Sequence, residues 1–231
     1  MNRWIKSLID LFYPQVCICC GAPFVEGEEY LCSECIINLP RTGFHLRPEN
    51  ATEQLFWGKV AIEKASSFLH FKKGGITQQI VHHLKYKGEQ KLGIIMGRLM
   101  ANEMRGGSFF DGIDLIVPVP LHKNRLKSRG YNQAEQIAIG LSEITGIPVC
   151  SNDLYRSIEN DSQTSRNVFR RWLNVRHIFL LKEASLFSEK HILIVDDVLT
   201  SGATLVSCIE TVERNVFCRV SVLTLGSTQK M

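Results

Sequence analysis

The chain has 231 residues, of which 45% are hydrophobic and 22% are charged, and its formal net charge is +4. This length and composition suit one sizeable α/β domain with a small appendage. The mild positive charge would suit a phosphate-bearing ligand but does not require one. No apolar stretch approaches the roughly 20 residues that a membrane-spanning helix needs, so the sequence predicts a cytoplasmic protein.

The first expected element is a short helix. Apolar residues recur at helical spacing near the N-terminus: Trp4, Ile5, Leu8, Ile9 and Phe12. This spacing predicts an amphipathic helix. No small-residue cleavage site follows, as a secretory signal would require. We expect the apolar face to pack on the domain or on a partner, with a membrane surface as the alternative.

A cysteine-rich segment comes next. Two C-x2-C pairs are separated by 11 residues, and their cysteines are Cys17, Cys20, Cys32 and Cys35. Zinc prefers four tetrahedral thiolates, and each pair presents two of them. The pattern predicts a structural zinc module, and the alternative is a reduced thiol cluster or a disulfide pair. Cys19 lies inside the first pair and could replace Cys17 or Cys20. We place the module in residues 1–45 and the α/β domain in residues 46–231.

The rest of the chain alternates between strand and helix patterns. The expected strands are 60–71, 114–120, 191–195 and 219–226, and the expected helices are 76–86, 91–104, 131–146 and 202–213. Such alternation predicts an α/β fold with a mainly parallel sheet flanked by helices.

The strand at 191–195 leads into two carboxylates and a hydroxyl-rich loop. Asp196 and Asp197 come first, and the loop consists of Thr200, Ser201, Gly202, Ala203 and Thr204. A helix then begins, and its free N–H groups suit a phosphate. The carboxylates can accept hydrogen bonds from sugar hydroxyls or help to retain Mg²⁺. Two alternatives are a capped helix after a charged turn and the acidic strand of a P-loop protein, although no G-x-x-x-x-G-K-[ST] motif is present.

Basic residues follow the strand at 114–120. Lys123, Arg125 and Arg129 occupy the expected loop, and Lys85 ends the helix at 76–86. These cations are candidates to bind pyrophosphate oxygens, because arginine binds phosphate in a bidentate manner. The alternative is a solvated basic surface.

A polar segment between the last two helices is a candidate lid over the site. Its polar candidates are Gln163, Arg171 and Asn174. Trp172 could stack on a base, or it could be a packing residue.

The motif VDDVLTSGAT (195–204) closely resembles the phosphoribosyl-pyrophosphate signature of type I phosphoribosyltransferases, with Ser201 where threonine is more frequent. It is preceded in order by the paired cysteines ending in LP, by LKYKG, by PVPLHKNRLKSRGYNQA and by the run Gln163–Arg171–Asn174. The whole arrangement is similar to the ComF family of competence-related, amidophosphoribosyltransferase-like proteins. Local departures are Cys19, Ser201 and ERNVFCRV before the last strand.

This resemblance implies a zinc-bearing N-terminus packed on a type I phosphoribosyltransferase fold. It also implies that Asp196 and Asp197 hold ribose hydroxyls, that Thr200–Thr204 hold the 5′-phosphate of phosphoribosyl pyrophosphate, and that the protein acts with DNA-uptake proteins in natural transformation. The competing hypothesis is a non-catalytic adaptor that binds a phosphoribosyl ligand or single-stranded DNA. In that case Tyr131 and Trp172 would stack on bases beside the basic loop.

Overall fold

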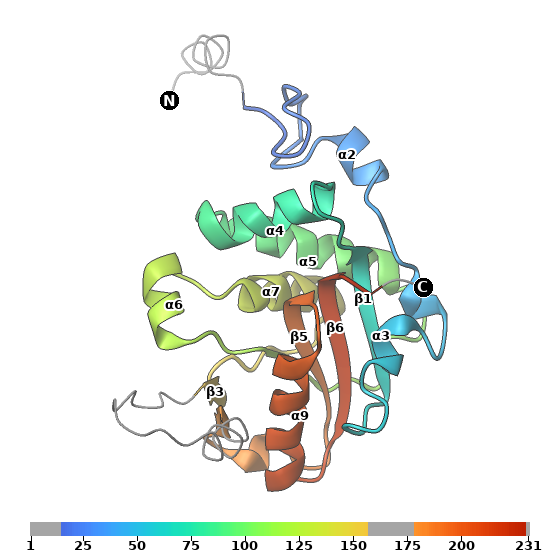
Figure 1. Ribbon diagram of the computed structural model, residues 1–231, viewed down its shortest axis with the longest axis vertical. Helices are drawn as coiled ribbons and strands as arrows, with labels where there is room; N and C mark the ends of the chain where they lie inside the picture. Colours follow the sequence, from blue (N-terminus) through green and yellow to red (C-terminus); the bar gives the residue numbers. More distant parts are fainter. Residues whose placement is uncertain (1–14, 157–177, 230–231) are drawn as a thin grey trace, which may run out of the picture.

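The computed structural model describes residues 15–156 and 178–229. At its centre is a four-stranded sheet in the order β1-β6-β5-β2. The strands are β1 (Lys64–His70), β6 (Arg219–Ser227), β5 (His191–Leu199) and β2 (Leu115–Pro118). All three pairings are parallel, which confirms the predicted α/β class (Figure 1). β5 continues four residues beyond the predicted strand end at Val195 and therefore includes both aspartates.

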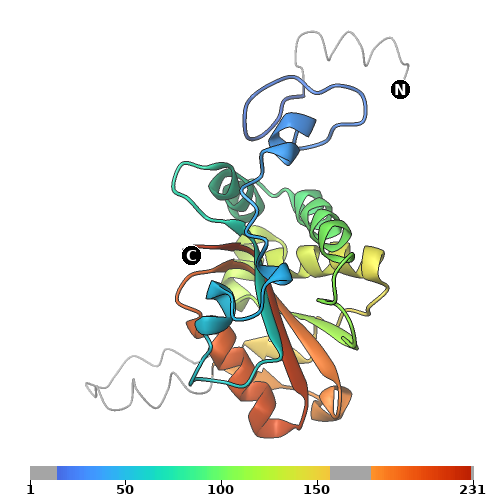
Figure 2. The same ribbon diagram turned by 90° about the vertical axis from the view of Figure 1, so that its right-hand side faces the viewer.

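Helices cover both faces of the sheet (Figure 2). One face packs against α4 (Ile76–Tyr86), α5 (Gln90–Met104) and α7 (Gln133–Thr145). The other face packs against α9 (Ala203–Asn215), η3 (Ala184–Phe187) and a two-stranded antiparallel sheet of β3 (Leu154–Arg156) and β4 (Phe179–Leu181). Along β5 the side chains alternate between the two cores, as the period of a strand requires, with Leu193 in one and Ile194 in the other.

Two glycines let α5 and α7 approach closely. A Cβ atom at Gly97 would lie 2.2 Å from the carbonyl oxygen of Ile137, and one at Gly140 would lie 2.1 Å from the carbonyl oxygen of Ile94. Only glycine fits at such separations, because backbone atoms of the facing helix occupy the space of a side chain. This contact fixes α7, whose N-terminal end borders the cavity described below.

The cysteine-rich segment ends in the short helix α2 (Ser33–Ile37) and packs on the outer side of α4 (Figure 1). Gln79 of α4, with its amide oriented to donate, bonds the backbone carbonyls of Ile18 and Cys19 at 2.9 and 3.0 Å. Two short helices, η1 (Phe44–Leu46) and α3 (Ala51–Gln54), then lead to β1. Asn50 caps α3 by accepting hydrogen bonds from the N–H groups of Thr52 and Glu53.

The basic segment after β2 is a helix, α6 (Lys123–Arg129), where the sequence predicted a loop. His122 precedes it and accepts a hydrogen bond from Asn124 N at its Nδ1 atom, which caps the helix. Gly130 ends it in the left-handed conformation, with φ of 80°. A cap and a stop this close together favour a two-turn helix, which the sequence reading missed.

Two predicted features fall outside the described residues. These are the N-terminal amphipathic helix and the lid candidates Gln163, Arg171 and Asn174, with Trp172. Within residues 15–156 and 178–229, no helix combines the length and the apolar character needed to cross a bilayer.

Candidate functional site

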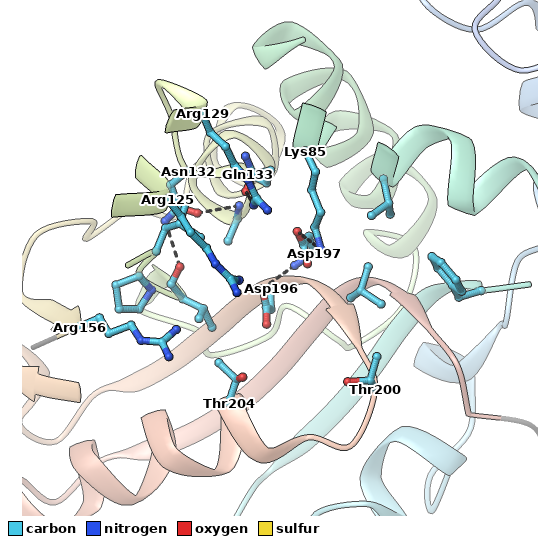
Figure 3. Close-up of a pocket in the computed structure, with 17 residues that line it drawn as sticks. Lys85, Arg125, Arg129, Asn132, Gln133, Arg156, Asp196, Asp197, Thr200 and Thr204 are labelled. Atoms are coloured by element: carbon cyan, nitrogen blue, oxygen red, sulfur yellow. Dashed lines mark hydrogen bonds and ion pairs between the residues drawn. The ribbon is translucent and has the colours of Figure 1, made fainter. Parts of the chain in front are cut away.

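A cavity of about 450 Å³ lies at the carboxyl end of β5, beside the connection that follows β2 (Figure 3). In open α/β sheets this is the edge at which ligands bind. Its wall combines polar and charged side chains with an apolar strip from residues 119–121. The polar lining residues are Lys85, Arg125, Arg129, Asn132, Gln133, Arg156, Asp196, Asp197, Thr200 and Thr204.

The two adjacent aspartates differ in their surroundings. Asp197 forms an ion pair with Lys85 of α4, with 3.0 Å between Oδ2 and Nζ. Asp196 Oδ1 accepts a hydrogen bond of 2.8 Å from the N–H of Asp197. Burial, and then the neighbouring Asp197 charge, raise the pKa of Asp196 to about 7. A cation or hydroxyl donor bound at Asp196 would favour the ionised form of its carboxyl group.

The predicted phosphate loop closes on the N-terminus of α9. Gly202 is the N-cap residue and has φ of 76°, a left-handed conformation that disfavours side chains. Gly202 has no side chain that could cap this helix, and the N–H of Ala203 donates a long hydrogen bond of 3.5 Å to Ser201 Oγ. Residues 198–205 and Asp196 surround a small hollow of about 30 Å³. Free N–H groups around a hollow at a helix N-terminus favour an anion.

Three of the four predicted cations line the cavity. Lys85, Arg125 and Arg129 line it, whereas Lys123 of α6 does not. Arg129 donates a hydrogen bond of 2.8 Å from Nη1 to Gln133 Oε1, and its Cζ lies 5.6 Å from the centre of the Tyr86 ring. The structure therefore brings three of the four predicted cations together around the aspartates.

Three polar lining residues were not assigned a role from the sequence: Asn132, Gln133 and Arg156. The run RGYNQA contains the first two, and Asn132 both caps α7 and donates to the carbonyl of Val119. The signal in the sequence that could have identified Asn132 and Gln133 is that both are polar residues at the start of a predicted helix. Arg156 ends the three-residue strand β3 and belongs to no motif, so only the fold could reveal it.

Tyr131 does not face the cavity as a stacking platform. Its ring is buried, with 6% exposure, and its hydroxyl donates to the carbonyl of Leu84 in α4. The exposed aromatic ring in this region is Tyr86, with 68% exposure. Tyr131 therefore ties α4 to the segment before α7, and its proposed base-stacking role is replaced by a packing role.

The four cysteines of the paired motifs form a cluster that could hold a metal ion such as zinc. The Sγ atoms of Cys17, Cys20, Cys32 and Cys35 all lie within 4.8 Å of one another, and Cys20 Sγ is 3.6 Å from Cys32 Sγ. Four sulfurs at about 2.3 Å from a zinc ion would be about 3.8 Å apart, so the donor set fits. The backbone N–H of Cys32 donates to Cys17 Sγ at 3.4 Å, and the backbone N–H of Cys35 donates to Cys32 Sγ at 3.5 Å.

Cys19 stands apart from this cluster. Burial, and then the neighbouring cysteine thiolates, raise the pKa of Cys19 to about 12, which keeps it a thiol. Burial also opposes ionisation of Cys17, but backbone N–H groups led by that of Cys32 outweigh it and lower the pKa of Cys17 to about 6. The structure thus selects Cys17 and Cys20, and not Cys19, as the two candidate ligands of the first pair.

No protein-family model matches the chain. Several curated relatives align with it. Competence protein F of Haemophilus influenzae is 28% identical over 130 residues, which cover 54% of this chain and 57% of that protein. DNA utilization protein YhgH of Salmonella typhi is 28% identical over 152 residues, which cover 64% and 66%. Competence protein ComFC of Streptococcus pneumoniae is 25% identical over 188 residues, which cover 78% and 80%. The chain is a homologue of these proteins. For the Salmonella protein, the match spans just under two thirds of its length.

Solved structures also align with the chain, at low sequence identity. An allosteric regulatory enzyme of purine biosynthesis aligns with a TM-score of 0.44 at 16% identity, over 63% of this chain and 30% of that chain. UMP synthase of Leishmania donovani aligns with a TM-score of 0.35 at 16% identity, over 77% and 30%. Adenine phosphoribosyltransferase of Leishmania tarentolae aligns with a TM-score of 0.35 at 15% identity, over 82% and 94%.

Proposed function

We propose that this protein binds phosphoribosyl pyrophosphate with Mg²⁺ in the cavity at the end of β5 and transfers its phosphoribosyl group to an acceptor. The main support is the continuity of the site. Asp196 and Asp197 lead directly into the loop that closes on the N-terminus of α9, where the N-cap residue is a glycine, and three cations face them across one cavity. We further propose that this activity serves DNA uptake in the cytoplasm, because the relatives are named for competence and DNA utilization.

In this proposal each part of the ligand has its own partners. The 5′-phosphate occupies the hollow formed by Thr200–Thr204, where hydroxyls and the N–H groups of α9 donate hydrogen bonds. Asp196 and Asp197 accept hydrogen bonds from the ribose hydroxyls. The same carboxylates offer the hard oxygen ligands that Mg²⁺ prefers, and the bound ion would neutralise charge on the pyrophosphate.

The transfer would break the bond between C1 of the ribose and the pyrophosphate oxygen, and the pyrophosphate would leave with the electron pair. A lone pair of the acceptor would form the new bond at C1. Lys85, Arg125 and Arg129 line the cavity and would stabilise the negative charge on the leaving group. The contribution of the protein is mainly positioning and electrostatic, because C1 becomes an oxocarbenium-like centre without a covalent enzyme intermediate.

Cys17, Cys20, Cys32 and Cys35 would hold a structural Zn²⁺ ion in the same proposal. Four thiolates close the coordination sphere, so the ion would stabilise the module and would not activate water. Because this module packs on α4, which carries Lys85, the zinc site would support the ligand site from outside.

Calorimetry with phosphoribosyl pyrophosphate and Mg²⁺ tests the proposal. We expect saturable binding by the native protein and at least a tenfold loss of affinity in the Asp196→Asn/Asp197→Asn variant. Asp111→Asn removes an exposed carboxylate in a turn away from the cavity and serves as the control. Absence of binding by the well-folded native protein would reject the site assignment. Acceptor-dependent release of pyrophosphate then tests turnover.

A second function, binding of single-stranded DNA by a non-catalytic adaptor, is favoured by one surface feature. Tyr86 exposes 68% of its area beside the cavity, and its ring contacts Arg129 and the ring of His82, whose centre is 5.2 Å away. An exposed ring among cations suits base stacking and phosphate contact. Strong salt-dependent DNA binding that is lost in Tyr86→Ala but kept in Tyr155→Ala, without pyrophosphate release, would favour this adaptor.

A further inference from the structure

Arg156 is a cation of the cavity that the proposed ligand contacts do not use. It lies at the end of β3, half-buried, and its guanidinium projects into the cavity from the side away from Lys85 (Figure 3). Within the described residues, the four ion pairs involve Lys85, Arg41, Arg98 and Arg214, and none involves Arg156. A partly desolvated guanidinium without an acidic partner is costly unless a ligand supplies the anion.

The position of Arg156 is fixed by the small antiparallel sheet. Its register partner is Phe179 of β4, which is buried with only 2% of the residue exposed. The Arg156 Cζ atom lies 5.7 Å from the centre of the Phe179 ring, within the range of a cation–π contact. The flat guanidinium is therefore held against an aromatic face, which leaves its N–H edge available to a planar, bidentate acceptor.

Arg156 does not line the small hollow proposed for the 5′-phosphate, although Thr200 and Thr204 line both that hollow and the larger cavity that contains Arg156. The hollow around Thr200–Thr204 is lined by residues 198–205 and Asp196, and Arg156 does not belong to it. Lys85, Arg125 and Arg129 come from α4 and α6, on the side proposed for the pyrophosphate. Arg156 instead shares the larger cavity with the apolar residues Val119, Pro120 and Leu121, which can cover a flat ring.

From this geometry we propose that Arg156 forms a subsite for a negatively charged acceptor, namely a planar ring that carries a carboxylate, and that the site selects against neutral bases. The inference rests on the proposed function, since it names the second substrate of the same cavity. The ring lies against the apolar strip and the carboxylate bonds Arg156. A ring nitrogen supplies the lone pair that attacks C1 as pyrophosphate leaves with the bonding electron pair, and a nitrogen that carries a proton, as in orotate, releases that proton to solvent.

Matched probes that differ mainly in the carboxylate test this subsite. Nicotinate is compared with nicotinamide, and orotate with uracil, by calorimetry without phosphoribosyl pyrophosphate and again with the Mg²⁺ complex present. At least one carboxylate is expected to bind the native protein tenfold or more tightly than its neutral partner. Arg156→Gln should abolish this preference, while its affinity for phosphoribosyl pyrophosphate stays within threefold of native. Arg156→Lys should retain part of the preference.

Arg98→Gln is the matched control, because Arg98 lies on α5 in an exposed ion pair with Glu143 and does not line the cavity. The inference is overturned if the native protein prefers no carboxylate or if the Arg156→Gln variant keeps the preference. It is also overturned if Arg156→Gln lowers the affinity for phosphoribosyl pyrophosphate as much as the affinity for the carboxylates. Carboxylate preference without phosphoribosyl pyrophosphate binding would support the anion subsite and reject the proposed function. Binding of phosphoribosyl pyrophosphate without a preference for carboxylates would reject the subsite and leave the proposed function standing.

Discussion

Lys85 and Asp197 form an ion pair of 3.0 Å that joins the last turn of α4 to the end of β5. Their side chains are 24% and 13% exposed, so the pair is shielded from most of the solvent. The preceding residue of α4, Leu84, accepts a hydrogen bond from the Tyr131 hydroxyl. The last turn of α4 is therefore attached both to β5 and to the segment before α7, and these contacts fix the position of Lys85 at the cavity.

Removal of the Lys85 charge should destabilise the folded protein and weaken binding of the proposed ligand. We expect Lys85→Met to lower the free energy of unfolding by about 1–3 kcal/mol, because it leaves the Asp197 carboxylate beside Asp196 without its cation. The double variant Lys85→Met/Asp197→Asn should recover most of that loss. Urea unfolding of the native protein and the three variants gives the coupling energy. Additive effects of the two substitutions would contradict a functional ion pair.

The raised pKa of Asp196 should make stability depend on pH. Burial and the Asp197 charge raise this pKa from 3.8 to about 7, so the folded protein holds a proton that the unfolded chain has released. The resulting stability is fully present below about pH 4 and is lost as the pH rises towards 7, by about 1–4 kcal/mol. Asp196→Asn should remove this decline.

Urea unfolding at pH 5 and pH 7.5 measures the difference, with Asp111→Asn as a control that keeps the native pH profile. The same titration should govern the ligand. If both carboxylates bind Mg²⁺ or ribose hydroxyls, affinity for the Mg²⁺ complex of phosphoribosyl pyrophosphate should increase as the pH rises through about 7. An Asp196→Asn variant with the native pH profile would show that another group titrates.

The cysteine cluster predicts which substitutions release the metal. Cys32→Ser should lose bound zinc, because Cys32 Sγ is one of the four candidate ligand atoms and lies 3.6 Å from Cys20 Sγ. Cys19→Ser should retain one zinc ion per chain, because Cys19 is outside the four-sulfur group. Elemental analysis of the purified proteins decides this, with Cys150→Ser as the control. Loss of zinc from Cys19→Ser alone would require a different ligand set.

The glycine contact between α5 and α7 should tolerate no side chain. Gly140→Ala places a Cβ 2.1 Å from the carbonyl oxygen of Ile94, so the helices must separate, and we expect a loss of about 2–4 kcal/mol. Gly106→Ala serves as the control, since its Cβ would have no atom within 4 Å. Thermal unfolding compares them. Equal melting temperatures for the two variants would mean that the helices adjust without cost.

Much of the fold could be predicted from the sequence, because local patterns coincide with the final elements. The expected helix at 76–86 matches α4, and the apolar run at 191–195 lies within β5. The position of the aspartates at a strand end could also be predicted, since the strand and the following loop are adjacent in sequence. The four cysteines were identifiable because zinc-ligand spacing is itself a local pattern.

The remainder depended on contacts that no local pattern contains. Arg156 reaches the cavity because β3 pairs with β4 across a gap in sequence, which brings the arginine over Phe179. Tyr131 resembled a stacking residue in sequence, but it is buried against α4 through a hydrogen bond 47 residues away. Lys123 and Arg125 are close in sequence, yet only Arg125 faces the cavity, because α6 turns the two side chains in different directions.

The strand order has a consequence for how the protein folds. β6 lies between β1 and β5, and its Thr224 bonds Ser67 of β1 across 157 residues of chain. Until Arg219–Ser227 has been synthesised, β1 and β5 share no neighbour, so the sheet edge that carries Asp196 cannot be completed. Folding should therefore be slow and governed by late, long-range pairing. During translation the unfinished sheet would expose the edges of β1 and β5, where transient protection against aggregation would matter most.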